Sequence, residues 1–199
     1  MQVNNSRSEN AAKNFIVSTS AYIVYTILAF VLRRIFIQYL GIEYLGVNGL
    51  FTNVLTILSF AELGIGNAII FSMYKPIKDN DIEKLQSLLK LFKNAYTIIG
   101  VTVFLVGMIL IPFLPHLING TTDISENLSL IYFLFLLNTS ISYFYSYRKA
   151  IISVYQQEYI NSICLEGSRI LQIILQGILL VLTRNFIIYL VVQIACTLI

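Results

Sequence analysis

Long apolar stretches separated by short polar links are the feature that most limits what this chain can fold into. The first stretch runs from Phe15 to Leu40 and holds only two charged residues, Arg33 and Arg34. About 17 to 25 apolar residues are enough for a helix to cross the hydrocarbon core of a bilayer. Hydrophobic residues make up 57% of the chain and charged residues 12%, so polar side chains could not cover this much apolar surface in water. The sequence therefore predicts an all-α integral membrane protein.

Polar residues divide the chain into six predicted membrane spans. A polar lead, residues 1–14, comes first and lacks the pattern of a cleaved signal peptide. Residues 15–199 are then one six-helix membrane lobe, with spans at about 15–40, 47–74, 95–114, 128–155, 160–182 and 185–199. The turn Gly41–Gly46 ends the first span, and Lys75 with Pro76 ends the second. The sixth is still apolar at Ile199, which favours an amino-terminal fragment or half of a longer protein.

The distribution of Lys and Arg predicts the orientation of the spans, because cytoplasmic segments carry an excess of these residues. With the amino terminus in the cytoplasm, the inner segments hold Arg7, Lys13, Lys75, Lys78, Lys84, Lys90, Lys93, Arg148 and Lys149. The outer segments hold only Arg184. We therefore expect a multi-pass protein of the cell membrane with a cytoplasmic amino terminus. The sequence has no basic stripe interleaved with exposed aromatic residues, so it does not indicate a nucleic-acid partner.

Ionisable residues inside the predicted spans are not explained by this topology. They are Arg33, Arg34, Glu62, Glu166 and Arg169. A charge at the centre of a spanning helix costs about 2.5 to 3.5 kcal/mol on insertion scales, so it usually faces a partner or a water-filled cavity. At about 1.5 Å of rise per residue, Glu62 lies near mid-membrane and Arg169 within about 5 Å of that depth. Arg33 is about 10 Å from it, so depth predicts Arg169 as the partner of Glu62.

Each of these charges also has an interpretation that needs no ligand. Arg33 and Arg34 can extend their side chains to the outer headgroups. Glu166 can form an i, i+3 ion pair with Arg169 within one helix. Glu62 can be a neutral, hydrogen-bonded carboxyl that holds two helices together, since burial disfavours the charged form.

Several other residues support a packing or interfacial interpretation. Gly64 and Gly66, next to Glu62, allow the second span to pack closely on a neighbour or to bend. Cys164 and Cys196 lie in apolar segments without a CxxC pattern, so we interpret them as packing residues and predict neither a disulfide nor a metal site. His116 is interpreted as an interfacial residue at the outer end of the third span. No G-x-x-x-x-G-K-[ST] motif is present, and we expect no ATP hydrolysis and no cofactor.

Three motifs carry a resemblance to bacterial polysaccharide-export proteins. They are the LG-x-E-Y-LG turn after a basic-ended first span, the F-A-E-L-G-I-G segment around Glu62 and the Y-Q-Q-E-Y-I-N-S link at residues 155–162. The first two belong to residues 40–90, which resemble the beginning of the O-antigen and capsule flippases. These are the oligosaccharide flippase branch of the multidrug, oligosaccharidyl-lipid and polysaccharide exporter superfamily.

The resemblance implies a bundle of about 12 to 14 helices in two lobes, related by an axis along the membrane normal. The present chain would be the amino-terminal lobe, and a carboxy-terminal helical lobe would be its missing partner. Such proteins flip undecaprenyl-diphosphate-linked oligosaccharides across the bacterial cytoplasmic membrane by alternating access, for surface polysaccharide biosynthesis. Lipid-linked oligosaccharide, membrane lipid and polysaccharide polymerase machinery are then the expected partners.

Site residues follow from the same resemblance. It implies that Arg33, Arg34 and Arg169 line a central cavity and donate charge-assisted hydrogen bonds to the diphosphate of the substrate. Glu62 and Glu166 would be carboxylates that carry an ion or pair two helices. No catalytic residue is expected.

Two other functions remain open. A cation-coupled multidrug-type antiporter of the same superfamily should have acidic residues dominating its cavity, whereas the spans hold three Arg and two Glu. A membrane enzyme of polysaccharide assembly needs a large outer loop or a catalytic cluster, and the short outer link with Asp123 and Glu126 offers neither. The balance of charge favours a transporter of an anionic substrate.

Overall fold

The computed structural model describes residues 7–62, 64–117, 124, 126–155 and 157–198. Every regular element in this part of the chain is helical. The α-helices are α1 (Arg7–Leu40), α2 (Ile42–Leu58), α3 (Ile65–Lys78), α4 (Ile82–Leu110), α5 (Leu114–Leu117), α6 (Leu128–Val154), α7 (Glu158–Thr183) and α8 (Phe186–Thr197). Short 3-10 turns lie at Ser59–Glu62 (η1) and Ile111–Phe113 (η2). The predicted all-α class is confirmed for these residues.

Four helical runs are long and apolar enough to cross a membrane, as a multi-pass membrane protein requires. They are Phe15–Leu40, Ile82–His116, Leu128–Val154 and Tyr159–Thr183. Two further apolar helices, Ile42–Leu58 and Phe186–Thr197, are shorter, with 17 and 12 residues. The second predicted span is divided between α2 and α3, and the sixth corresponds to the 12-residue helix α8.

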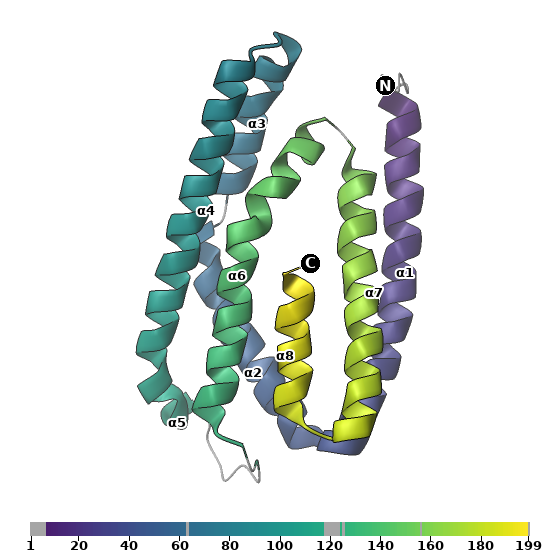
Figure 1. Ribbon diagram of the computed structural model, residues 1–199, viewed down its shortest axis with the longest axis vertical. Helices are drawn as coiled ribbons and strands as arrows, with labels where there is room; N and C mark the ends of the chain where they lie inside the picture. Colours follow the sequence, from purple (N-terminus) through teal and green to yellow (C-terminus); the bar gives the residue numbers. More distant parts are fainter. Residues whose placement is uncertain (1–6, 63, 118–123, 125, 156, 199) are drawn as a thin grey trace.

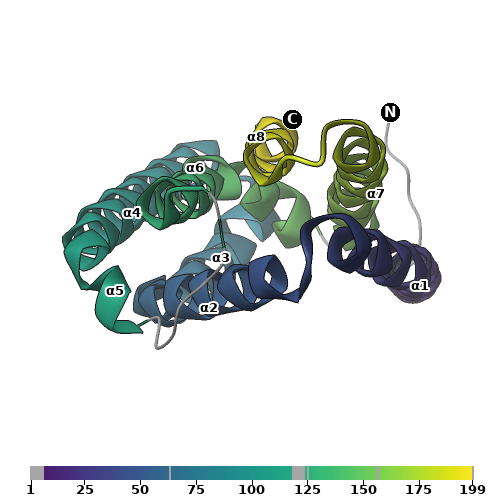
Figure 2. The same ribbon diagram turned by 90° about the horizontal axis from the view of Figure 1, so that it is seen from below.

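The helices form two groups with a bridge between them (Figure 1). In one group α1 packs lengthwise along α7, and in the other α4 packs along α6, with α3 beside α4. Helix α8 lies between α6 and α7 and contacts both. Figure 2 shows α2 running across the molecule from the α1 end toward α4 and α6. The space enclosed by α1, α2, α6, α7 and α8 is where the candidate site lies.

Basic residues gather at one end of this bundle. The α3–α4 and α6–α7 turns lie at the same end as the start of α1, whereas α5 and the α7–α8 connection lie at the other (Figure 1). The first end therefore carries Lys78 in the last turn of α3 and Lys149 near the end of α6. Arg184 is at the opposite end, where its guanidinium lies 5.5 Å from the ring of Tyr39. The segregation of charge that the sequence predicts is thus present in the fold.

The second predicted span is a broken helix rather than a continuous one. Helix α2 ends at Leu58, η1 follows, and α3 begins at Ile65 after Gly64. Gly64 has a φ of 87°, in the left-handed region that glycine adopts without a steric penalty. The bend that the glycines permit is confirmed.

The ends of this broken span also differ from the prediction. The predicted Gly41–Gly46 turn is reduced to Gly41, with a φ of 98°, because α2 already begins at Ile42. At the other end α3 continues through Pro76 to Lys78. Proline removes one backbone donor, but the last turn is still closed, since the Asp81 N–H donates to the Pro76 carbonyl at 2.9 Å.

The third predicted span begins much earlier than expected. This span was predicted at about 95–114, but the stretch LQSLLKLFKN, which comes directly before it, already lies inside α4, and α4 begins at Ile82. The side chain of Asp81 caps this helix by accepting a hydrogen bond from the Lys84 N–H at 3.0 Å. Phe92 is buried while Lys93 is exposed, so the mixed stretch is one amphipathic part of a long helix.

Helices α6, α7 and α8 agree closely with the predicted fourth, fifth and sixth spans. The predicted continuation of the fourth past Arg148 and Lys149 is confirmed. Asn127 caps α6 by accepting from the Ser129 N–H at 2.9 Å, and Asn185 caps α8 by accepting from the Ile187 N–H at 2.8 Å. Such caps satisfy backbone donors that the first turn of a helix leaves unpaired.

An aromatic cluster joins the two groups of helices. The ring of Phe186 on α8 is fully buried and lies 5.6 Å from Phe36 on α1 and 5.3 Å from Tyr44 on α2, both edge to face. Phe51 on α2 lies 5.2 Å from Tyr132 on α6. Such pairs add about 0.5 to 1.5 kcal/mol each beyond the burial of their area. They hold α2 and α8 against α1 and α6, beside the polar cavity described next.

Candidate functional site

A cavity of about 450 Å³ lies among α1, α2, α6, α7 and α8. We call it the polar cavity, because side chains with hydrogen-bonding groups make up most of its lining. The charged and amide or hydroxyl residues among them are Arg33, Asn48, Asn138, Arg169, Gln172, Gln176, Gln193 and Thr197. Polar groups inside an apolar helical bundle are costly unless they are paired or wet, so their gathering at one cavity marks the candidate site.

Two of the three predicted cavity arginines line the polar cavity. Arg33 enters it from α1 and Arg169 from α7. Arg33 and Arg34 are both exposed, but Arg34 is not among the lining residues. Successive residues of an α-helix point about 100° apart, so neighbouring side chains have different surroundings, and at this part of α1 the lining residues are Leu32 and Arg33. Of the three arginines, the structure places Arg33 and Arg169 at the polar cavity and Arg34 outside its lining, and their role toward a substrate stays a prediction.

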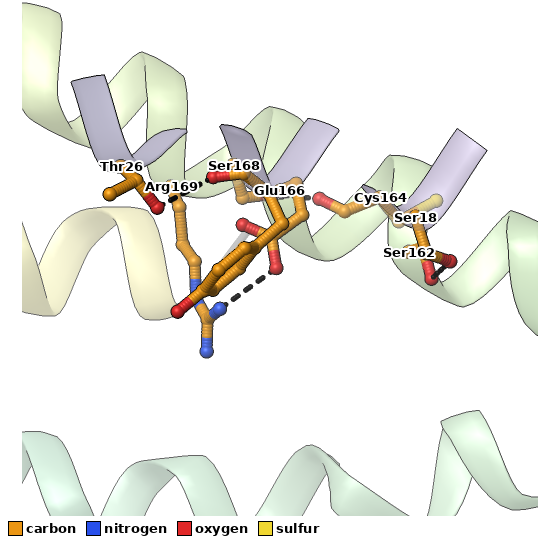
Figure 3. Close-up of polar contacts among 8 residues, drawn as sticks. Ser18, Thr26, Ser162, Cys164, Glu166, Ser168 and Arg169 are labelled. Carbon is orange, nitrogen blue, oxygen red and sulfur yellow. Dashed lines mark hydrogen bonds and ion pairs between the residues drawn. The ribbon is translucent and has the colours of Figure 1, made fainter. Parts of the chain in front are cut away.

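Arg169 is held by partners on two helices. Its Nη1 donates to Oε1 of Glu166 at 2.9 Å, and its guanidinium lies 5.5 Å from the ring of Tyr25 on α1. Figure 3 shows Arg169 and Glu166 joined in this way. The i, i+3 ion pair predicted for these two residues is confirmed. A guanidinium has five N–H donors, so the bond to Glu166 leaves donors that can bind an oxygen atom in the cavity.

Glu166 is the more deeply buried partner of this ion pair. Its side chain is 10% exposed, whereas that of Arg169 is 43% exposed. Among the residues that the structure describes, no group donates a hydrogen bond to its second carboxylate oxygen, Oε2. Glu166 does not itself line the polar cavity. Its contribution there is to orient Arg169.

Amide side chains of α7 and α8 fix another part of the lining. Gln176 is almost completely buried, and its Nε2 donates to the carbonyl of Tyr189 at 3.0 Å. Its Oε1 accepts from Nε2 of Gln172 at 3.3 Å, and the Thr197 hydroxyl donates to Oδ1 of Asn138 at 2.8 Å. These bonds connect α7, α8 and α6 and hold the amides in fixed orientations, as polar side chains do between helices in lipid.

These amides are not among the site residues predicted from the sequence. Gln172 and Gln176 are four residues apart and therefore share one face of α7, which is a signal that the sequence does contain. Arg169 lies one turn before Gln172 on the same helix and extends this polar face. An amide and guanidinium stripe on an otherwise apolar span could thus have predicted most of the α7 wall.

A smaller cavity of about 140 Å³ adjoins the polar cavity and shares Asn138 and Gln193 with it. Its other polar lining residues are Thr52, Thr56, Ser59 and Thr139. Hydrogen-bonding side chains thus continue from α7 and α8 across α6 to the end of α2. The chain provides a polar surface that crosses from one helix group to the other.

Glu62 lies outside these two cavities and has a partner other than the predicted one. Its Oε1 accepts a hydrogen bond from the Tyr96 hydroxyl of α4 at 2.8 Å. Arg169 pairs with Glu166 instead, so the predicted Glu62 to Arg169 pair is wrong. Similar depth in the membrane does not bring two side chains together laterally, and η1 packs against α2 and α4 whereas α7 packs against α1 and α8. Glu62 connects two helices, as its ligand-free interpretation expects.

The remaining predicted residues do not form a reactive centre. Both cysteines are free; Cys196 is buried, as predicted for a packing residue, whereas Cys164 is exposed on α7. His116 is exposed in α5, at the end of the molecule opposite the basic turns. Within the described residues, no three His, Cys, Asp or Glu side chains gather as a set of metal ligands.

Comparisons of this chain with models of known protein families, with curated proteins and with solved structures find no match. The case for a function therefore depends on the chemistry and geometry of the polar cavity.

Proposed function

We propose that this chain is the amino-terminal six-helix lobe of a membrane transporter that flips an undecaprenyl-diphosphate-linked oligosaccharide by alternating access. The observation that supports the proposal most strongly is that Arg33 and Arg169 line one polar cavity between helices whose outer faces are apolar. Two guanidinium groups at a shared cavity suit an anionic ligand with several oxygen atoms, such as a diphosphate.

The substrate chemistry accounts for the mixture of polar and apolar surfaces. A diphosphate and its sugars cannot enter hydrocarbon without losing their hydration, whereas a polyprenyl chain is soluble there. The guanidiniums of Arg33 and Arg169 would replace water around the diphosphate, and amides such as Gln172 would bond sugar hydroxyls. The volume of about 450 Å³ is within the range of about 300 to 1,000 Å³ typical of ligand sites.

Alternating access also needs a second wall and a moving part. In the proposal, a carboxy-terminal lobe closes the polar cavity from the other side, and the two lobes rock against each other around the site, as repeats of secondary transporters do. The six helices α1, α2 with α3, α4, α6, α7 and α8 would be the spans of the first lobe.

The neighbouring arginines provide a matched test of the proposed role. The protein is reconstituted in vesicles with lipid-linked oligosaccharide, and transfer to the opposite leaflet is measured. We expect Arg33→Gln to lower the transfer rate about tenfold or more, because a charge-assisted hydrogen bond is worth about 1.5 to 3 kcal/mol. Arg34→Gln removes the same charge one residue away, outside the cavity, and should change the rate less than about twofold. Equal effects of the two substitutions would contradict the proposed site.

A cation-coupled antiporter is the second candidate, and one feature of the fold favours it. Glu62 is the last residue of η1, immediately before the break that precedes α3. Broken helices in transporters often bind coupling ions at the break. In the same vesicles, cation-driven drug uptake that is lost in Glu62→Gln, with no transfer of lipid-linked oligosaccharide, would identify this function instead.

A further inference from the structure

A second groove, of about 470 Å³, lies between α4 and α6 near the end where the α3–α4 and α6–α7 turns are found. We call it the basic groove. It is lined by Leu89, Lys90, Lys93, Tyr147, Arg148 and Ile151. None of these residues lines the polar cavity, so the basic groove is a separate feature that the proposed transport function does not use.

The basic groove concentrates positive charge from two helices. Lys90 and Lys93 come from α4 and Arg148 from α6, and no lining residue is acidic. Among the side chains that the structure describes, no carboxylate forms an ion pair with any of these three cationic groups. The described lining of the groove is therefore a cationic surface that contains no carboxylate.

Tyrosine rings hold two of these cations in place. Nζ of Lys93 lies 5.6 Å from the centre of the Tyr147 ring, and the guanidinium of Arg148 lies 5.0 Å from that of Tyr145. A cation over the face of an aromatic ring gains about 0.5 to 1 kcal/mol at exposed sites. Long basic side chains that would otherwise be mobile are thus oriented at the groove.

The depth of the groove can be counted along both helices. About 20 helical residues cross the hydrocarbon core. Counted from Leu110, the far end of α4, this length reaches Leu91, next to Lys90. Counted from Leu128, the far end of α6, it reaches Tyr147, next to Arg148. Counted from these two helix ends, Lys90 and Arg148 fall just beyond the hydrocarbon core and Lys93 falls within one turn of its edge.

We propose that the basic groove binds the phosphate headgroup of an anionic glycerophospholipid from the leaflet facing this end of the molecule. Lys90, Lys93 and Arg148 would contact the phosphate, and Leu89 and Ile151 would contact the apolar part of the lipid. In the predicted orientation this is the cytoplasmic leaflet. Basic pockets between spanning helices on that side are known to suit anionic headgroups. A free phosphate has no apolar part that could contact the apolar walls of the groove.

A lipid-binding measurement tests this inference. The protein is placed in micelles containing equal amounts of phosphatidylglycerol and phosphatidylcholine, and the lipid that remains bound is measured by native mass spectrometry. We expect bound phosphatidylglycerol in preference to phosphatidylcholine. The double variant Lys93→Gln/Arg148→Gln should bind phosphatidylglycerol about 25-fold more weakly, since each basic residue near an anionic surface contributes about fivefold.

Matched controls distinguish binding in the basic groove from an effect of the overall charge of the protein. Lys75→Gln/Lys78→Gln removes the same charge from the same end but outside the groove, and it should keep the binding of the unaltered protein. The variant Lys93→Arg/Arg148→Lys keeps the charge of the groove and should bind phosphatidylglycerol as strongly as the unaltered protein does. If the double glutamine variant melts at a lower temperature without anionic lipid, Arg148→Gln alone should still weaken binding about fivefold.

Three results would overturn the inference. These are an equal loss in the Lys75→Gln/Lys78→Gln control, no preference over phosphatidylcholine, and unchanged binding in the groove variants. Displacement of phosphatidylglycerol by inorganic phosphate at the same concentration would assign the groove to a free phosphate and also overturn it. None of these measurements depends on transport, so the result does not change if the proposed substrate is wrong.

Discussion

Arg33 and Arg34 are adjacent in α1, yet only Arg33 lines the polar cavity. Rotation by about 100° per residue gives neighbouring side chains different surroundings. Glu166 and Arg169 show the opposite case, because a spacing of three residues brings an acid and a base onto one face of α7, 2.9 Å apart. At the scale of single residues, the angular position of a side chain around the helix axis decides whether its charge faces the cavity or pairs with a neighbouring side chain.

The Glu166 to Arg169 ion pair should contribute to stability because its acid is buried. Arg169→Gln would leave Glu166 without its donor, and we expect a loss of about 1 to 2 kcal/mol in the free energy of unfolding in detergent. This is less than for a fully buried pair, since the arginine is partly exposed. The double variant Glu166→Gln/Arg169→Gln leaves no unpaired charge and should recover about half of that loss. A double variant less stable than Arg169→Gln would contradict this account.

At the scale of elements, the break between α2 and α3 is the main departure from a regular span. It combines the 3-10 turn η1, the left-handed Gly64 and the hydrogen bond from Tyr96 to Glu62. The backbone changes direction where the glycine allows a positive φ, and the carboxylate next to the break is tied to α4. The end of α2 is thereby brought beside α6, where Thr52 and Ser59 line the smaller cavity.

Two glycines of this region should respond to alanine in opposite directions. Gly64→Ala forces a residue with a Cβ into a φ of 87°, and we expect a loss of about 1 to 2 kcal/mol in the free energy of unfolding. Gly49 lies inside α2, and a Cβ there would meet no atom within 4 Å. Gly49→Ala should therefore raise stability by about 0.5 to 1 kcal/mol. Thermal melts in detergent measure both, and a stabilising Gly64→Ala would exclude the assigned break.

At the scale of the molecule, segments far apart in the chain form the two helix groups. Helix α1 packs along α7, where the hydroxyls of Ser18 and Ser162 lie 2.7 Å apart (Figure 3). Helix α8 is inserted between α6 and α7 and supplies Gln193 and Thr197 to the polar cavity. The cavity therefore exists only when both groups, α2 and α8 are assembled.

Crosslinking tests this arrangement directly. In a protein with Cys164→Ala and Cys196→Ala, the pair Ser18→Cys/Ser162→Cys should form a disulfide under mild oxidation, because the two side chains face each other across the α1–α7 contact. The pair Ser20→Cys/Ser162→Cys is the control, since Ser20 points to another side of α1. Gel mobility after proteolysis between the helices measures the crosslink. Equal yields for the two pairs would contradict the packing of α1 on α7.

The sequence by itself determined the all-α membrane class, the segregation of basic residues to one end and the course of α6, α7 and α8. These properties follow from the lengths of apolar runs and from local polar signals, which are one-dimensional. Tertiary structure decided that Arg33 and not Arg34 lines the cavity, that Tyr96 and not Arg169 contacts Glu62, and that the second span is broken. The reason is physical: sequence sets depth and periodicity, whereas the rotation and lateral position of each helix are set by close packing against its neighbours.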